Sequence, residues 1–254
     1  MINEILLGVI QGITEWLPIS SSGHLVIFQQ LFNTNSPIIF DVMLHVATLF
    51  VILFVFFEEI KNIISSFLKF DFNSTYGKLG IMIIVGSIPT AIIGLTFHDF
   101  FISLYSNLTA VSIALIINGF ILFFTKYTKG SKKIKIFDAV LIGIAQGLAI
   151  IPGISRSGIT ISTGLYKGLN RKSVAAFSFL LSVPAILGAT ILEGKDLLVE
   201  NINYFSLGIS MLVSIIIGYI ALKLLLKLVL NKKLYLFSYY CWFIGIILLL
   251  YTTI

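Results

Sequence analysis

The sequence has few charged residues: Asp, Glu, Lys and Arg together make up 11% of its 254 residues, whereas soluble domains contain about 25%. It has a single cysteine, Cys241, which excludes a disulfide within the chain. It also lacks a polar linker, so one domain over 1–254 is expected. Hydrophobic residues make up 58% of the chain, and the mean hydropathy is +1.06. This composition predicts an all-α integral membrane protein.

Apolar runs of the length that crosses a bilayer, about 17–25 residues, predict six transmembrane helices. Two further apolar segments, 4–30 and 138–166, are interrupted by Pro18 with Gly23 and by Pro152-Gly153 with Gly158. Such breaks predict re-entrant helical hairpins, which enter the membrane and turn back. The six predicted spans lie near 40–57, 80–97, 108–125, 173–192, 205–228 and 235–253.

The basic residues indicate the orientation of the chain. Every Lys and Arg except Lys195 and Arg156 falls on the cytoplasmic side if the segment 138–166 begins and ends there. A hairpin meets that condition, and a single straight span does not. Because the net charge of +6 lies in short loops between apolar runs, it predicts a lipid bilayer as partner and no nucleic acid.

The two broken segments are similar in sequence. Adding 135 to the residue number maps Leu6, Gly8, Gln11, Gly12, Ile19, Ser20, Ser22 and Gly23 onto identical residues between 141 and 158. This match predicts two repeats, about 1–127 and about 136–254. Each repeat holds one hairpin and three spans, and the odd number of crossings inverts the second repeat relative to the first. The two tips are then expected to meet near the midplane around a cavity.

The first tip, Gln11 to His24, is rich in polar side chains. Buried polar groups without partners cost several kcal/mol, and intramembrane ionisable groups are functional by default. Gln11 and Glu15 share one helix face, because they are four residues apart. Ser20, Ser21 and Ser22 have an alternative interpretation as helix caps or contacts between helices.

The second tip has the composition of an anion-binding site. Its glycines permit a tight turn with exposed N–H groups, its serines add hydroxyl donors, and Arg156 adds a permanent charge. A phosphate or diphosphate fits this set. The alternative is a buried structural ion pair between Arg156 and Glu15. His45 and Asp41, four residues apart at the outer end of the first span, are weaker candidates, since Asp41 also suits a helix N-terminus.

These two motifs resemble those of the bacterial undecaprenyl-diphosphate phosphatase family, membrane enzymes linked to bacitracin resistance. The family pattern, a Glu or Gln and a Glu four residues apart before Pro-x-Ser-Ser-x-Gly-His, is matched from Gln11 to His24. The second pattern, Pro-Gly-x-Ser-Arg-Ser-Gly, is matched from Pro152 to Gly158. The first position of this pattern is the amide Gln11 in this chain. An amide and one carboxylate form a weaker divalent-metal site than two carboxylates would.

The resemblance implies hydrolysis of undecaprenyl diphosphate to undecaprenyl phosphate and inorganic phosphate, which recycles the lipid carrier of cell-wall synthesis. It implies the bacterial cytoplasmic membrane, with the site toward the outer leaflet. Mg²⁺ or Ca²⁺ on Glu15 and Gln11 is a possible cofactor, and no organic cofactor is expected. As catalytic residues we predict Ser21 as nucleophile, His24 as the group that takes its proton or serves the leaving group, and Glu15 as the carboxylate that orients His24 or a metal ion. Arg156 is predicted to hold the diphosphate. As substrate-binding residues we predict Gln11, Ser20, Ser22, Gly153, Ser155, Ser157 and Gly158.

Two alternatives stay open at this stage. His24 is the rival nucleophile to Ser21. A membrane transporter or flippase of a phosphorylated prenyl lipid or anion is the rival function, because inverted repeats with broken helices are typical of transporters. The sequence is compatible with a homodimer.

Overall fold

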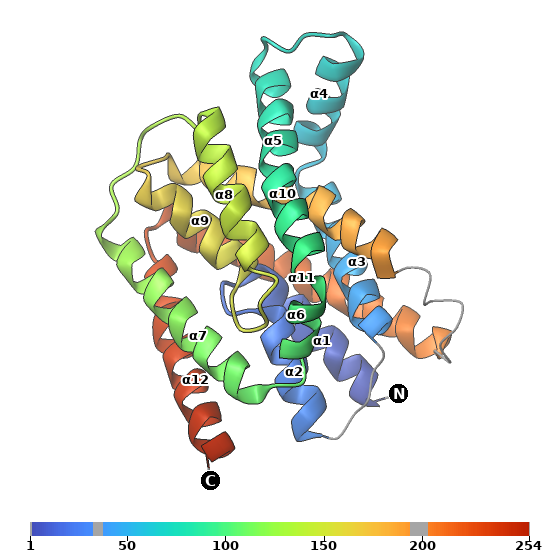
Figure 1. Ribbon diagram of the computed structural model, residues 1–254. Helices are drawn as coiled ribbons and strands as arrows, with labels where there is room; N and C mark the ends of the chain where they lie inside the picture. The colour runs from blue at the N-terminus through green and yellow to red at the C-terminus, as the bar shows by residue number, and fades with distance from the viewer. Residues whose placement is uncertain (1, 33–37, 194–202, 254) are drawn as a thin grey trace.

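A computed structural model describes residues 2–32, 38–193 and 203–253. The described residues contain helices and no β-strand (Figure 1). Lys195 lies outside the described residues. The α-helices are α1 (Ile2–Trp16), α2 (Ser21–Leu31), α3 (Ile38–Val55), α4 (Phe57–Leu68), α5 (Thr75–Thr96), α6 (His98–Leu104), α7 (Leu108–Phe123), α8 (Ile136–Leu148), α9 (Arg156–Tyr166), α10 (Arg171–Glu193), α11 (Tyr204–Leu230) and α12 (Phe237–Thr253).

Both broken segments form two helices joined by a turn, α1 with α2 and α8 with α9. Each second helix begins at a serine N-cap: the Ser20 Oγ accepts from the Gly23 N–H, and the Ser155 Oγ accepts from the Gly158 N–H. Gly153 in the second turn has a φ of +104°, which favours glycine. In Figure 1 the loop between α8 and α9 reaches the middle of the molecule, where the turn between α1 and α2 also lies.

Among the described residues, five helices are long and apolar enough to cross a membrane, or six if the bent pair α3–α4 counts as one span. The five are α5, α7, α10, α11 and α12, which correspond to five of the predicted spans. α3 coincides with the remaining prediction, 40–57, but the chain bends by 80° after it and continues as α4. The sequence did not predict α4, whose residues include the charged Glu58, Glu59 and Lys61.

The first helix of each hairpin packs closely along a long helix from the other half of the chain. α1 lies on α11, where a methyl group on Gly8 would collide with the backbone of Ser210. α8 lies on α5, where a methyl group on Gly143 would collide with the backbone of Gly86. Glycine is required at both crossings because the helix backbones touch there.

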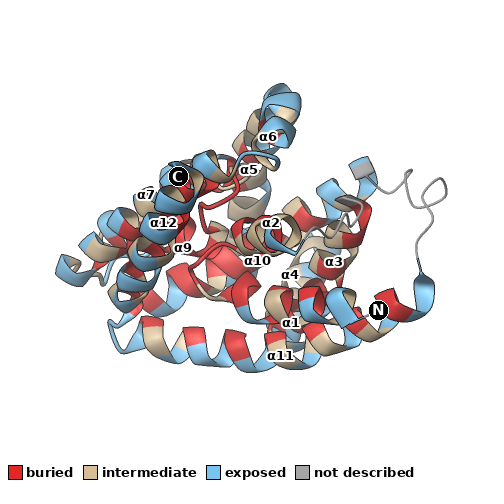
Figure 2. Cartoon of the chain, turned by 90° about the horizontal axis from the view of Figure 1, so that it is seen from below, coloured by how far each residue is buried: buried red, intermediate tan, exposed pale blue. Residues whose placement is uncertain are grey.

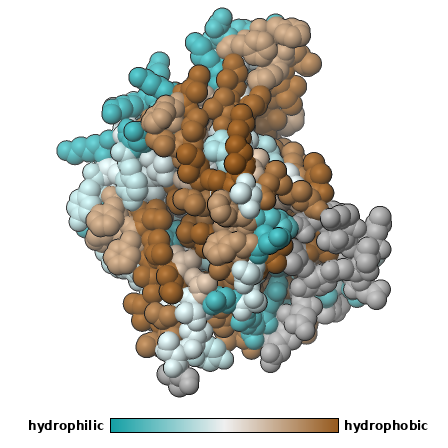
Figure 3. Space-filling model, in the orientation of Figure 1, coloured by the Kyte–Doolittle hydropathy of each residue, from teal (hydrophilic) through white to brown (hydrophobic). Residues whose placement is uncertain are grey.

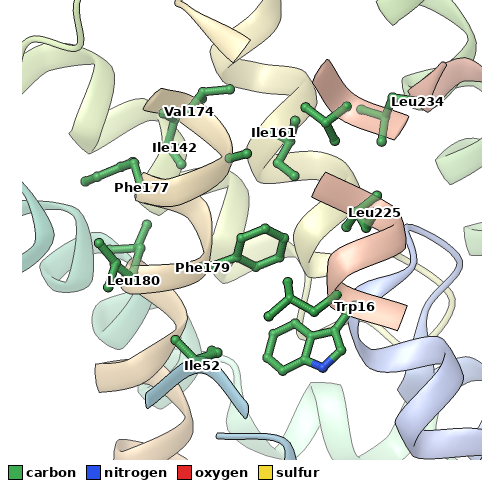
Figure 4. Close-up of a cluster of buried hydrophobic side chains, with 14 of the residues drawn as sticks. Trp16, Ile52, Ile142, Ile161, Val174, Phe177, Phe179, Leu180, Leu225 and Leu234 are labelled. Carbon is green, nitrogen blue, oxygen red and sulfur yellow. The ribbon is translucent and has the colours of Figure 1, made fainter. Parts of the chain in front are cut away.

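The largest cluster of buried side chains lies where the two hairpins meet the long helices (Figure 4). Trp16 at the end of α1 packs edge-on against Phe179 of α10, with ring centroids 5.7 Å apart. Ile52 of α3, Ile161 of α9 and Leu225 of α11 complete the contacts around this pair. The core therefore fixes both turns relative to α3, α10 and α11.

The outer surface is hydrophobic. In Figure 3 brown residues cover much of the middle of the molecule, and hydrophilic residues gather at its upper and upper-left edges and in smaller patches in its lower half. Large apolar side chains such as Phe54, Ile191 and Phe243 are more than 60% exposed. In Figure 2, α11 is buried on the side toward α1 and exposed on the opposite side. A surface of this kind faces lipid, so the chain is a multi-pass membrane protein.

Candidate active site

Glu15 is the centre of the polar site. Its side chain is only 2% exposed, and its two carboxylate oxygens have different neighbours. Oε1 accepts a hydrogen bond from Nη2 of Arg156. Oε2 lies 2.7 Å from the Ser21 hydroxyl oxygen, 3.0 Å from Nε2 of Gln11 and 2.9 Å from Nδ1 of His45. A buried carboxylate is thus neutralised by Arg156 and bonded to a hydroxyl.

Four elements bring these groups together. Gln11 and Glu15 lie one turn apart near the end of α1, as their spacing predicts. Ser21 begins α2, and Arg156 begins α9. His45 comes from the middle of α3. The structure therefore brings the predicted Ser21, Glu15, Arg156 and Gln11 into one cluster.

The two tips bind each other through backbone groups. The Ser20 hydroxyl accepts from the N–H of Gly153 at 3.0 Å, in addition to capping α2. Asn118 of α7 lies between the tips: its Nδ2 donates to the carbonyl of Pro18 at 2.9 Å, and its Oδ1 accepts from the N–H of Ser155 at 3.2 Å. Asn118 was not predicted as a site residue, although an amide within the apolar run 108–123 is a visible signal in the sequence.

His24 lies beside a different set of groups from Ser21. Its Nδ1 is 2.8 Å from the carbonyl oxygen of Ser20, and its Nε2 is 2.8 Å from the hydroxyl of Tyr240 on α12. The two rings are stacked, with centroids 5.7 Å apart. Because a carbonyl only accepts, Nδ1 carries the proton, and Nε2 accepts from Tyr240. The imidazole next to Glu15 and Ser21 is that of His45.

A cavity of about 590 Å³ opens beside this cluster. At one end its wall is polar and contains Glu15, Ser21, His45 and Arg156. Most of the remaining wall is apolar and comes mainly from α5 and α10, with small residues such as Gly94, Ala185, Gly188 and Ala189. Ser87, Thr90, His98 and Gln146 are polar residues that also line it. The cavity thus joins a charged end to a hydrophobic slot, as an amphipathic ligand requires.

The other predicted binding residues divide into two groups. Ser20, Ser22 and Ser155 also contribute to the cavity wall. Outside the cavity wall, the Gly153 N–H donates to Ser20, the Gly158 N–H donates to the Ser155 hydroxyl, and the Ser157 hydroxyl donates to the carbonyl of Trp16 at 3.0 Å. These bonds hold the two tips in place.

The donor set for a metal ion is small. The described residues contain no group of three or more His, Cys, Asp and Glu side chains that could hold an ion. Glu15 is the one carboxylate of the cluster. The neighbouring Gln11, whose Nε2 donates to Glu15, has a buried Oε1 without a hydrogen-bond partner. Mg²⁺ commonly binds through one or two carboxylates plus substrate phosphates. These residues therefore fit an ion that arrives with a phosphorylated substrate.

This chain is similar to known proteins over nearly its whole length. Residues 4–247 match the family model described as bacitracin resistance protein BacA. The undecaprenyl-diphosphatase of Halothermothrix orenii is 43% identical, with 97% of this chain and 96% of the relative covered. The undecaprenyl-diphosphatase of Alkaliphilus metalliredigens is 43% identical, with 98% of both chains covered. That of Methanosphaera stadtmanae is 37% identical, with 100% of this chain and 99% of the relative covered. The chain belongs to the bacitracin resistance protein BacA family.

Proposed function

We propose that this protein is a membrane phosphatase that hydrolyses undecaprenyl diphosphate to undecaprenyl phosphate and inorganic phosphate. The observation that carries the proposal is the cluster at the polar end of the cavity. There the Ser21 hydroxyl is 2.7 Å from the buried carboxylate of Glu15, which also pairs with Arg156. The relatives at 37–43% identity are named undecaprenyl-diphosphatase, which supports the same reaction.

The proposed chemistry proceeds in two steps. The Ser21 oxygen attacks the terminal phosphorus, its proton passes to Oε2 of Glu15, and the bond from that phosphorus to the bridging oxygen breaks. Undecaprenyl phosphate leaves, and water then hydrolyses the phosphoserine and restores the Ser21 hydroxyl. Arg156 neutralises the charge on the transferred phosphoryl group, and the N-terminus of α9 favours negative charge beside it.

His24 keeps two possible roles in this proposal. As a base it would take the Ser21 proton, and as the rival nucleophile it would carry the phosphoryl group itself. Either role requires its ring to leave Tyr240, which now occupies Nε2. Glu15 is already within hydrogen-bond distance of the Ser21 hydroxyl. Geometry therefore favours Ser21 with Glu15.

We propose Gln11 and Glu15 as the protein ligands of a Mg²⁺ or Ca²⁺ ion. The support is that Oε1 of Gln11 is buried without a hydrogen-bond partner, on a side chain whose Nε2 lies 3.0 Å from the Glu15 carboxylate. Such an ion would neutralise negative charge on the diphosphate oxygens. Gln11 also donates to Glu15 through its Nε2, which fixes the carboxylate before substrate binds.

The prenyl tail would occupy the apolar part of the cavity between α5 and α10. Two positions on the long helices make this testable, because a Cβ atom added at Gly188 or at Gly208 meets no atom within 4 Å. Gly188 is part of the cavity wall, and Gly208 on α11 is not. Gly188→Leu should therefore fill the slot, and Gly208→Leu should leave it open.

We expect Gly188→Leu to raise KM for undecaprenyl diphosphate about 30-fold, because displacing two or three buried CH₂ groups costs about 2 kcal/mol. A diphosphate with a much shorter prenyl chain should be affected less. Phosphate release measured against substrate concentration checks this, with Gly208→Leu as the matched control. Equal KM values for the two variants would place the tail elsewhere.

We also propose the inverted repeat, with two re-entrant hairpins and six spans. The hairpin helices have 11–15 residues, or about 16–22 Å, which is too short to cross about 30 Å of hydrocarbon. Gly8 and Gly12 of α1 face Ser210 and Ile217, whereas Gly143 and Gly147 of α8 face Gly86 and Ile93. Gly143 and Gly147 follow Gly8 and Gly12 by 135 residues. The residues that they face, Gly86 and Ile93, precede Ser210 and Ile217 by 124 residues. This exchange supports repeats of about 1–127 and 136–254.

The predicted orientation gives the location of the site. With the basic loops in the cytoplasm, the first hairpin enters from outside and the second from inside. Ser21 then faces the outer leaflet of the bacterial cytoplasmic membrane. An enzyme there would act on a lipid diphosphate left at the outer surface.

Purified protein in detergent with undecaprenyl diphosphate tests the function directly. We expect equal amounts of inorganic phosphate and undecaprenyl phosphate. A transporter or flippase of phosphorylated prenyl lipid would need the same anion site but no nucleophile, so it would release no phosphate. Movement of labelled lipid between leaflets without phosphate release would favour that alternative.

A further inference from the structure

His45 lies outside both polar tips, on α3, yet it contacts the centre of the site. Its Nδ1 is 2.9 Å from Oε2 of Glu15 and 2.8 Å from Nε2 of Gln11. Its side chain is 28% exposed and belongs to the cavity wall. From the sequence, His45 was a weaker candidate, at the outer end of the first predicted span.

When Nδ1 of His45 carries a proton, its two neighbours determine where that proton is directed. Of the two neighbours of Nδ1, only the carboxylate oxygen accepts, because an amide nitrogen is a donor. A proton on Nδ1 is therefore directed to Oε2 of Glu15. The same oxygen accepts from the Ser21 hydroxyl at 2.7 Å. His45 and Ser21 are thus joined through one atom of Glu15.

Glu15 must stay in place when the substrate binds. Its other oxygen, Oε1, is held by Arg156, the side chain that the proposed reaction directs to phosphate. When Arg156 turns to the phosphate, Glu15 loses its strongest partner. His45 keeps its contact, because it approaches the opposite oxygen from a different helix.

α3 provides a rigid support for this imidazole. Leu44 and Ala47, on either side of His45, are fully buried, and the helix packs against α10 and α11. One turn earlier, both oxygens of Asp41 accept from Nε2 of Gln29 on α2, at 3.0 and 2.9 Å. α3 is thereby tied to the helix that begins at Ser21.

We propose that His45 is a positioning residue, which acts through Glu15: its Nδ1–H holds the carboxylate so that Oε2 faces Ser21 during phosphoryl transfer. This inference rests on the proposed phosphatase function. It concerns a different imidazole from that of His24, which lies against Tyr240. Loss of a residue that orients a functional side chain through a hydrogen bond typically lowers activity about 10- to 100-fold.

The test uses two substitutions at His45. His45→Leu removes the donor and keeps an apolar side chain of similar bulk, whereas His45→Asn keeps an N–H close to the position of Nδ1. We expect His45→Leu to lower kcat about 10- to 100-fold with KM for undecaprenyl diphosphate within about twofold. His45→Asn should recover most of kcat. Rescue by an N–H donor with KM unchanged is not expected from a role in packing alone.

A double-mutant cycle with Glu15→Gln tests the route of the effect. Because His45 acts through the carboxylate, His45→Leu should lower kcat no further in the Glu15→Gln protein. Equal activity of His45→Leu and native protein, additive losses, or failure of His45→Asn to rescue would each overturn the inference. If His45→Leu fails to fold, His45→Asn keeps the inference falsifiable, because a kcat far below native with Glu15 present would overturn it. Absence of phosphate release by the native protein would instead contradict the proposed function.

Discussion

Ser21→Ala is expected to lower phosphate release at least 10³-fold while the protein still folds. The substitution removes the oxygen that attacks phosphorus, and loss of a nucleophile commonly costs this much or more. It also removes the 2.7 Å bond to Glu15, but Arg156, Gln11 and His45 remain around that carboxylate. The measurement is single-turnover phosphate release, with thermal unfolding in detergent to compare stability.

Ser112→Ala is the matched control for Ser21→Ala. Ser112 is a buried serine on α7 whose hydroxyl donates to the carbonyl of Thr109, and it is not part of the cavity wall. It should keep native kcat and KM. Trapping the phosphoenzyme with labelled substrate adds a direct readout. Label on His24 instead of Ser21, or full activity of Ser21→Ala, would contradict the proposed nucleophile.

Arg156→Met is expected to lower both stability and activity strongly. It leaves Glu15, with a side chain 2% exposed, as a buried carboxylate without its cation. Removing one partner of a buried ion pair costs about 3–5 kcal/mol. Activity should fall at least 10³-fold, because the phosphoryl group loses its positive partner. Thermal unfolding in detergent and phosphate release measure the two effects on the same preparation.

The double substitution Arg156→Met with Glu15→Gln separates the two interpretations of this pair. Neither side chain then carries a charge, so most of the lost stability should return. Activity should stay low, because the phosphate-binding cation and the proton acceptor of Ser21 are both absent. A double variant with both native stability and native phosphate release would mean that the pair is a structural ion pair only.

The helical architecture could be predicted closely from the sequence. The length of the apolar runs predicted α5, α7, α10, α11 and α12. Runs of this length match the thickness of the hydrocarbon core that a helix must cross. Pro18 and Pro152-Gly153 marked the two turns, and Ser20 and Ser155 cap the helices that follow. The sharp bend into α4 was not predicted. Nothing in the run 40–57 marks it, since no proline or glycine stands there.

The sequence by itself determined the class of protein and the kinds of groups in its site. Hydrophobic composition required a membrane protein, and the motifs supplied a hydroxyl, a carboxylate and a guanidinium in two matching turns. Spacing along one helix also determined the contact of Gln11 with Glu15, because residues four apart share a face.

Only the tertiary structure decided which groups meet across helices. It joined Glu15 to Arg156, 141 residues away, and set His45 rather than His24 beside the carboxylate of Glu15. It also put Asn118 between the two tips. Such contacts depend on the rotation of each helix about its axis and on the angle at which it crosses its neighbours. Packing of the whole bundle sets both quantities, and no local spacing encodes them.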